Sequence, residues 1–221
     1  MSSRPSRWTE RLRELAGDLL QEAWERAERV GSIRPGSRRA RRFGAFGDDT
    51  VICFPMAALF GERSIHVGAG CLLGPYMSLS AGVSPLDIRD HPVVHIGDRC
   101  LLGKGTGIVG HQSIVLGDDV WTGHHVYITD ANHGYQDVDV PIGRQFAPPR
   151  PVRIGDASWL GHGAIVVGGV TIGRHVVVGA GAVVTGDLPD YSVAVGNPAR
   201  VIRRYVDGEW TRVDAAAETS G

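Results

Sequence analysis

The sequence predicts an all-β fold, in which a parallel β-helix of six-residue repeats follows an N-terminal α-helix and carries one extruded loop. Branched aliphatic residues recur at every sixth position in the second half of the chain. The 221 residues include 31 glycines but only 7% aromatic residues, which suits many tight corners and small packed side chains. The repeat is interrupted once, between Ile128 and Ile154, by polar and proline-rich sequence.

The six-residue spacing favours strands over a helix. Six residues do not return to the same face of an α-helix, whereas short β-branched strands joined by glycine turns satisfy this period. The recurring aliphatic residues are Ile154, Leu160, Val166, Ile172, Val178 and Val184. Small or β-branched residues stand two places earlier, at Ser158, Ala164, Val170, Val176 and Ala182. The same phase extends less regularly through Val67, Leu73, Leu79, Ile96, Leu102, Ile108, Leu116 and Ile128.

Charge and cysteine content exclude several classes of protein. The 23 basic and 24 acidic residues leave a net charge of −1, so we expect no binding to nucleic acid. Three widely spaced cysteines argue against a disulfide framework or a cysteine zinc site. Cys71 and Cys100 occupy the small-residue position of the repeat, which favours inward packing over a redox or metal role. Lacking a signal-like or membrane-spanning apolar run, the chain is expected to be cytoplasmic, without stable membrane insertion.

Three regions are expected along the chain. Residues 1–45 contain an amphipathic helix that ends at Gly31, followed by an arginine-rich linker. We interpret this linker as solvated, although a lipid or nucleic-acid contact is the alternative. Residues 46–205 form the β-helix, and residues 206–221 form a polar tail.

The interruption predicts a loop at about residues 129–153, because its prolines cannot occupy a central strand. Loops of this length in a compact fold are usually functional or disordered. The repeat resumes in phase at Ile154, which favours an ordered loop. Its first part, "TDANHGY", carries His133 among short polar residues. An imidazole, whose ordinary pKa is about 6.5, could accept a proton near neutrality.

The segment "IGDASWLGHGAIVVGGVTIGRHVVVGAGAVVTGDLPDYSVAVGNPARVIR" resembles the hexapeptide-repeat acyltransferases, in particular the maltose and galactoside O-acetyltransferase group. The resemblance covers about residues 67–204. It implies a left-handed β-helix of triangular cross-section, assembled as a homotrimer. It also implies direct transfer of an acetyl group from acetyl-CoA to a sugar or glycan-like hydroxyl, with no metal and no covalent intermediate.

The resemblance assigns roles to particular residues. His133 matches the catalytic base of the family. Asn132 and Asp130 would orient its ring or an acceptor hydroxyl, unless they only bond their own backbone. Further acceptor contacts are considered for Tyr76 and Asp87. The residues that match the coenzyme A groove are Trp159, His162, Ala180, Thr185, Arg200 and Arg203.

Two departures from the family qualify this assignment. Where relatives commonly have lysine after the threonine, this chain has Gly186, so one contact to the donor is missing. The asparagines that hold the sugar in galactoside- and maltose-type enzymes are replaced by a stretch that offers Gly74 and Tyr76. The acceptor is therefore expected to differ from a simple glucoside or galactoside.

Other functions remain open. One is N-acetylation of an amino sugar or antibiotic. Another is a zinc carbonic anhydrase of the β-helical type, for which histidines at positions 91, 95, 111, 124 and 125 could supply ligands. The third is a scaffold without chemistry, against which the retention of His133 and the two arginines argues.

Overall fold

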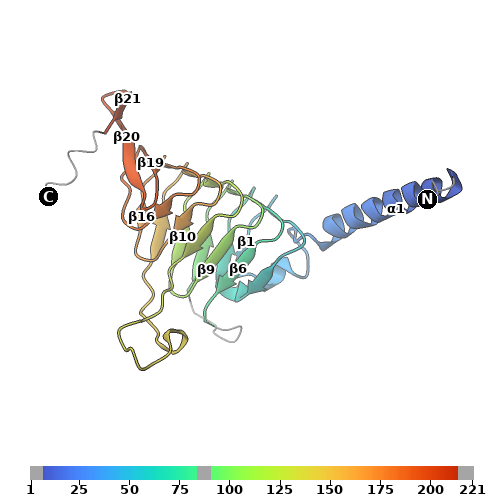
Figure 1. Cartoon of the computed structure of the whole chain (residues 1–221), viewed down its shortest axis with the longest axis horizontal. Coiled ribbons are helices and arrows are strands. Elements are labelled where there is room, and N and C mark those ends of the chain that lie inside the picture. The colour runs from blue at the N-terminus through green and yellow to red at the C-terminus, as the bar shows by residue number, and fades with distance from the viewer. Residues whose placement is uncertain (1–6, 84–90, 214–221) are drawn as a thin grey trace, which may run out of the picture.

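The computed structural model describes residues 7–83 and 91–213, whose main body is a β-helix of three sheets (Figure 1). The first sheet contains β1 (Ala45–Phe46), β4 (Ile65–Val67), β7 (Val94–Ile96), β10 (Ile114–Leu116), β13 (Val152–Ile154) and β16 (Thr171–Ile172). The second contains β2 (Val51–Ile52), β5 (Leu72–Leu73), β8 (Leu101–Leu102), β11 (Trp121–Thr122), β14 (Trp159–Leu160), β17 (Val177–Val178), β19 (Ser192–Val195), β20 (Arg200–Val206) and β21 (Glu209–Arg212). The third contains β3 (Ala58–Phe60), β6 (Ser78–Ala81), β9 (Gly107–Gly110), β12 (Tyr127–Thr129), β15 (Ile165–Val166) and β18 (Val183–Val184).

The six-residue pattern forms the core, as predicted. Each coil contributes one short strand to each sheet, and strands of successive coils pair in parallel. All the recurring aliphatic positions between Val67 and Val184 are at most 2% exposed. Each such side chain contributes on the order of 1.5–3 kcal/mol through burial. The parallel β-helix is therefore confirmed, and these side chains hold it together.

The two repeat cysteines pack inward, as expected from their position. Cys71 is 2% exposed and Cys100 is 1% exposed. The Cys71 thiol donates to the carbonyl of Gly97 at 3.1 Å, and the Cys100 thiol donates to that of Gly117 at 3.2 Å. Both thiols are thus used to join neighbouring coils.

Carboxylates join the coils at one corner, between the first and second sheets. The Oδ1 atoms of Asp98, Asp118 and Asp156 each accept a backbone N–H from the preceding coil, at 2.8–2.9 Å. The coils approach so closely here that a Cβ at Gly155 would lie 2.6 Å from a backbone nitrogen of the next coil. Aspartate and glycine at these corners therefore serve coil stacking.

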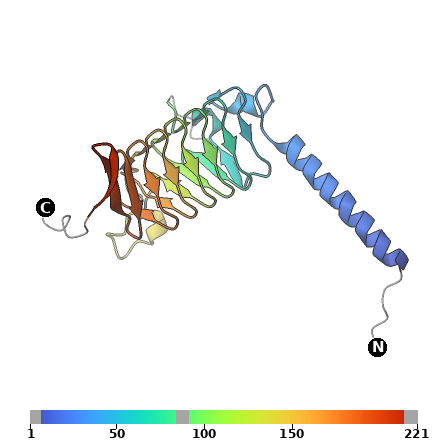
Figure 2. The same cartoon turned by 90° about the horizontal axis from the view of Figure 1, so that it is seen from above.

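The N-terminal helix is confirmed as α1 (Arg7–Gly31), and it projects away from the β-helix (Figures 1 and 2). None of its residues is buried. Neither α1 nor any other helix in the described ranges is long and apolar enough to cross a membrane.

The expected linker is partly structural. Ile33, Ala40 and Phe43 are buried at the N-terminal end of the β-helix, and Ile33 bridges to Ile52 in antiparallel fashion. This segment includes the short helix η1 (Ala40–Arg42), and a second short helix, η2 (Glu62–Ser64), lies nearby in sequence. The arginines of this linker are exposed, in agreement with the interpretation as solvated, while its apolar residues cover the open end of the first coil.

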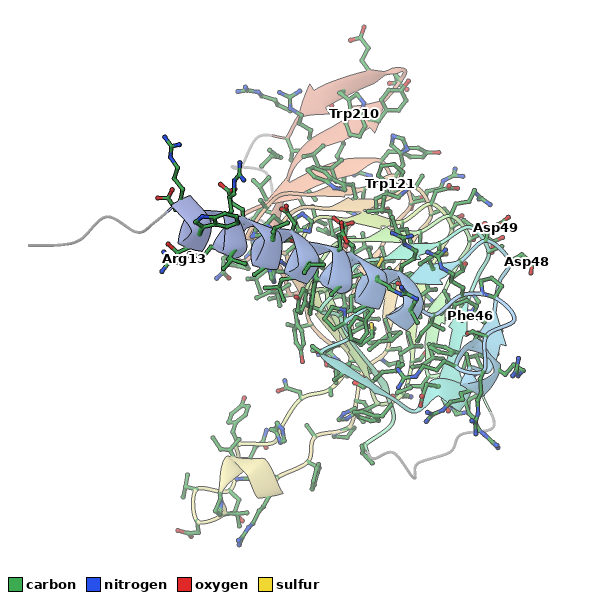
Figure 3. The ribbon with its side chains drawn as sticks, turned by 90° about the vertical axis from the view of Figure 1, so that its right-hand side faces the viewer. Arg13, Phe46, Asp48, Asp49, Trp121 and Trp210 are labelled. Atoms are coloured by element: carbon green, nitrogen blue, oxygen red, sulfur yellow. The ribbon has the colours of Figure 1, made fainter. Side chains whose placement is uncertain are left out.

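The C-terminal region also differs from the prediction of a polar tail from Val206 onward. Strands β20 and β21 form an antiparallel hairpin that extends the second sheet. Tyr205 and Trp210 face each other across it with ring centroids 5.5 Å apart, and Trp210 stacks on His175. Figure 3 labels Trp210 on this hairpin. Cross-strand aromatic pairs stabilise such ribbons. The Asp207–Gly208 dipeptide between apolar and aromatic residues was the available signal for this hairpin.

Candidate active site

The predicted loop leaves the β-helix after β12 and returns at β13, so it comprises residues 130–151. It contains the short helix η3 (Ile142–Arg144) and projects from the side opposite the hairpin (Figures 1 and 3). A cleft of about 550 Å³ lies at its base, between the loop stems and the third sheet. Its lining includes Tyr127, Asp130, His133, Phe146, Arg150 and Thr185.

His133 is held at this cleft by the opposite stem of the loop. It forms an antiparallel bridge to Phe146, and its ring lies 6.2 Å from that of Phe146. Its Nδ1 lies 3.3 Å from the carbonyl oxygen of Gln145. Since a carbonyl can only accept, this bond requires the proton on Nδ1. The neutral ring then has a free lone pair on Nε2, which is the arrangement of a general base.

Asp130 is buried, with 1% exposure, and its carboxylate joins two coils. It accepts the backbone N–H groups of His111, Gln112 and Ser113, each at 2.7 Å. Its carbonyl accepts the N–H of Arg150 at 2.8 Å. Both stems of the loop are thus tied to the β-helix at one residue. The carboxylate therefore bonds the backbone of a neighbouring coil, which differs from both the local backbone bonding and the ring-orienting role considered for Asp130.

Of the other expected acceptor residues, Asn132 lines the cleft and Tyr76 does not. The Oδ1 of the exposed Asn132 accepts the N–H of His133 at 2.8 Å. Tyr76 does not line the cleft; it lies at the corner after β5, where the Lys104 ammonium is 5.0 Å from its ring centroid. Asp87 lies outside the described residues.

Part of the expected donor site forms a second hollow, of about 310 Å³. Thr185, Gly186 and Arg200 line it, and Thr185 lines the His133 cleft as well. Its second arginine is Arg204, and Arg203 is not part of the lining. The register shift between β19 and β20 breaks the regular alternation of β20, so spacing along the chain did not identify this pair. A Cβ at Gly186 would meet no atom within 4 Å, so the backbone here does not require glycine for lack of space.

The remaining donor residues lie elsewhere on the chain. Trp159 is on the second sheet beside Trp121, which is labelled in Figure 3. The two residues are 46% and 52% exposed. His162 and Ala180 occupy the corner between the second and third sheets, where Gly181 donates to the His162 carbonyl at 2.8 Å. None of these residues lines the His133 cleft of the same chain.

The histidines considered for zinc are not gathered into a site. No three His, Cys, Asp or Glu side chains in residues 7–83 and 91–213 are placed to hold a metal ion. His124 and His125 are each near His162, with ring centroids 6.3 and 5.6 Å away, but they form no such group. His95 lies in β7 of the first sheet, and His91 precedes that strand.

Comparison with known proteins identifies the repeat. The family model for the bacterial transferase hexapeptide (six repeats) matches residues 151–186, and that for the hexapeptide repeat of succinyl-transferase matches residues 93–129. A solved structure of AntD, an N-acyltransferase from Bacillus cereus, superposes with a TM-score of 0.62. It covers 77% of this chain and 90% of AntD at 18% identity, so the likeness concerns the fold alone.

Two relatives extend the match in sequence. A probable acetyltransferase of Mycobacterium tuberculosis, Rv3034c, is 42% identical over 117 residues, which are 52% of this chain and 39% of that protein. The match to this chain covers between 39% and 65% of the length of this relative and of three other acetyltransferase relatives. The galactoside O-acetyltransferase of Escherichia coli is 33% identical over 150 residues, 68% of each chain. Because this last relative is more than 30% identical over about two thirds of each chain, the chain belongs to the hexapeptide-repeat acetyltransferase family.

Proposed function

We propose that this protein transfers an acetyl group from acetyl-CoA to a hydroxyl of a sugar or glycan-like acceptor. The observation that carries the proposal is the His133 ring, whose Nδ1 faces the Gln145 carbonyl and whose Nε2 is left free at a ligand-sized cleft. The relationship to O-acetyltransferases supports a hydroxyl acceptor over an amine.

In the proposed reaction, Nε2 of His133 accepts the proton of the acceptor hydroxyl as its oxygen attacks the thioester carbon. The tetrahedral intermediate then collapses, the C–S bond breaks, and the imidazolium returns the proton to the CoA thiolate. The products are an O-acetyl ester and free CoA. No protein nucleophile is needed, because a thiolate is already a good leaving group.

The donor is proposed to bind with its phosphates at the hollow of Arg200 and Arg204. Guanidinium groups match phosphate oxygens in bidentate geometry. Thr185 adjoins both this hollow and the cleft, so a donor lying across it would extend toward His133. Trp159 would pack along the pantetheine arm from a neighbouring copy.

The reaction is tested by thiol release from acetyl-CoA in the presence of sugars, sugar acids and sugar phosphates. An O-acetyl ester is cleaved by neutral hydroxylamine, whereas an N-acetyl amide is stable. A hydroxylamine-resistant product would therefore replace O-transfer by N-transfer, and the absence of thiol release with every acceptor class would contradict the proposal.

We also propose a homotrimer in which neighbouring copies share each site. The outer face of the second sheet exposes Leu72, Trp121 and Trp159, at 46%, 52% and 46%. The loop exposes Val138 and Phe146, at 92% and 80%. These apolar surfaces lie on different sides of one chain, so a closed ring would cover them all.

Mixed assemblies test the shared site. Neither His133→Ala nor Trp159→Ala alone should be fully active at limiting donor. After the two variants are refolded together, about one quarter of the sites in a random trimer should combine an intact His133 with an intact Trp159. Activity should recover accordingly, and sedimentation should give three times 23.6 kDa. A site within one chain would show no recovery on mixing, because every chain would carry one lesion.

A further inference from the structure

The cleft around His133 offers positive charge without an available carboxylate. Asp130 is the one acidic residue in its lining, which consists entirely of described residues. That carboxylate is 1% exposed and accepts three backbone N–H groups. The residues of the lining that can carry a positive charge are His111, His133 and Arg150. Such a lining favours an anionic ligand over a cationic one.

Arg150 is fixed in the cleft wall by its backbone and by a glycine. Its N–H donates to the Asp130 carbonyl at 2.8 Å, and its carbonyl accepts the N–H of Gly169 at 3.0 Å. The guanidinium lies directly over Gly169, where a Cβ would collide with it. Gly169 also has a φ of +88°, so both its backbone and this contact require glycine. Backbone bonds on both sides thus fix the main chain of Arg150 beside the cleft, and the residue forms part of the lining.

Arg150 forms no ion pair, as is true of most arginines in the described residues, whereas three others do. Arg42, Arg99 and Arg174 each pair with a carboxylate, at 3.0, 2.7 and 3.6 Å. Within the two described ranges, no carboxylate forms an ion pair with Arg150. Its five N–H donors form a planar fork that matches a carboxylate or a phosphate.

We infer that the acceptor carries an anionic group, a carboxylate or a phosphate, which binds Arg150 while its hydroxyl faces His133. The inference rests on the proposed acetyl transfer and names the acceptor class. The donor phosphates have their own arginines, Arg200 and Arg204, in the separate hollow. Acidic sugars such as uronic acids or sugar phosphates fit this description, and neutral sugars lack the group that Arg150 binds.

Binding to the full-length protein with CoA present tests this directly. The probes are glucose, glucuronate and glucose 1-phosphate, which share a ring and differ in charge. Both anionic sugars, or one of them, should bind at least tenfold more tightly than glucose, and the stronger of the two identifies the anion. Arg150→Gln should abolish this preference, with a loss on the order of tenfold in anionic-sugar affinity and unchanged CoA affinity.

Two matched variants complete the experiment. Arg144→Gln removes a loop arginine that does not line the cleft, and it should leave all affinities unchanged. Arg200→Gln should weaken CoA binding while the anionic preference persists. The inference is overturned if all three sugars bind equally or not at all, or if Arg150→Gln weakens CoA instead. Arg150-dependent sugar binding without any thiol release would support the anion site and contradict acetyl transfer.

Discussion

His133→Ala is expected to lower kcat for acetyl transfer by roughly 10²- to 10⁴-fold, the usual effect of losing a general base. The reason is the ring orientation, since the Gln145 carbonyl holds the proton on Nδ1 and leaves Nε2 to accept the acceptor proton. The affinity for CoA should change little, because the imidazole acts on the hydroxyl and not on the nucleotide. Steady-state kinetics with both substrates varied, together with CoA titration, measure the two effects separately.

His95→Ala is the matched control, because His95 is an exposed histidine of the first sheet, outside the cleft. It should retain wild-type kcat. If His133→Ala also retained near wild-type turnover, the base would lie elsewhere, and the orientation of the ring would have no catalytic meaning.

Asp130→Asn is expected to destabilise the junction between the loop and the β-helix by about 2–3 kcal/mol. The substitution keeps the shape but places an amide NH₂ group against backbone N–H donors, where two carboxylate oxygens now accept three bonds at 2.7 Å. Buried donors that lose an acceptor bear their full desolvation cost. Thermal unfolding should begin at lower temperature, proteases should cut within residues 130–151 faster, and kcat should fall as His133 loses its fixed position.

Asp156→Asn provides the comparison for this effect. Its carboxylate also accepts a backbone N–H from the neighbouring coil, but at an exposed corner and with one bond at 2.9 Å. We expect a smaller loss of stability and no change in cleavage of the loop. Equal unfolding temperatures and equal loop cleavage for the two variants would show that Asp130 does not tie the loop to the β-helix.

The fold was predictable because its rule is local and repetitive. Each aliphatic residue such as Leu160 meets its equivalents in adjacent coils, so the same six-residue spacing describes the chain and the packed core. The loop was predictable as a break in this spacing, and His133 was predictable from family resemblance. The packing of Phe43 on the first coil and the hairpin of Trp210 were not predicted. Each occurs once, at one end of the β-helix, so the sequence holds no repeated pattern that would reveal it.

The sequence by itself determined the coils and the place of the loop, and the candidate base His133 is a prediction from family resemblance. Only the tertiary structure decided what the polar residues near that base do. Asp130 faces backbone groups of the preceding coil, whereas Arg150 reaches the cleft because the loop stems meet and Gly169 leaves room. These contacts join residues on different coils, separated by a loop of arbitrary length. Spacing along the chain therefore carries no information about these contacts. The stacking of the coils decides which way each side chain at the junction points.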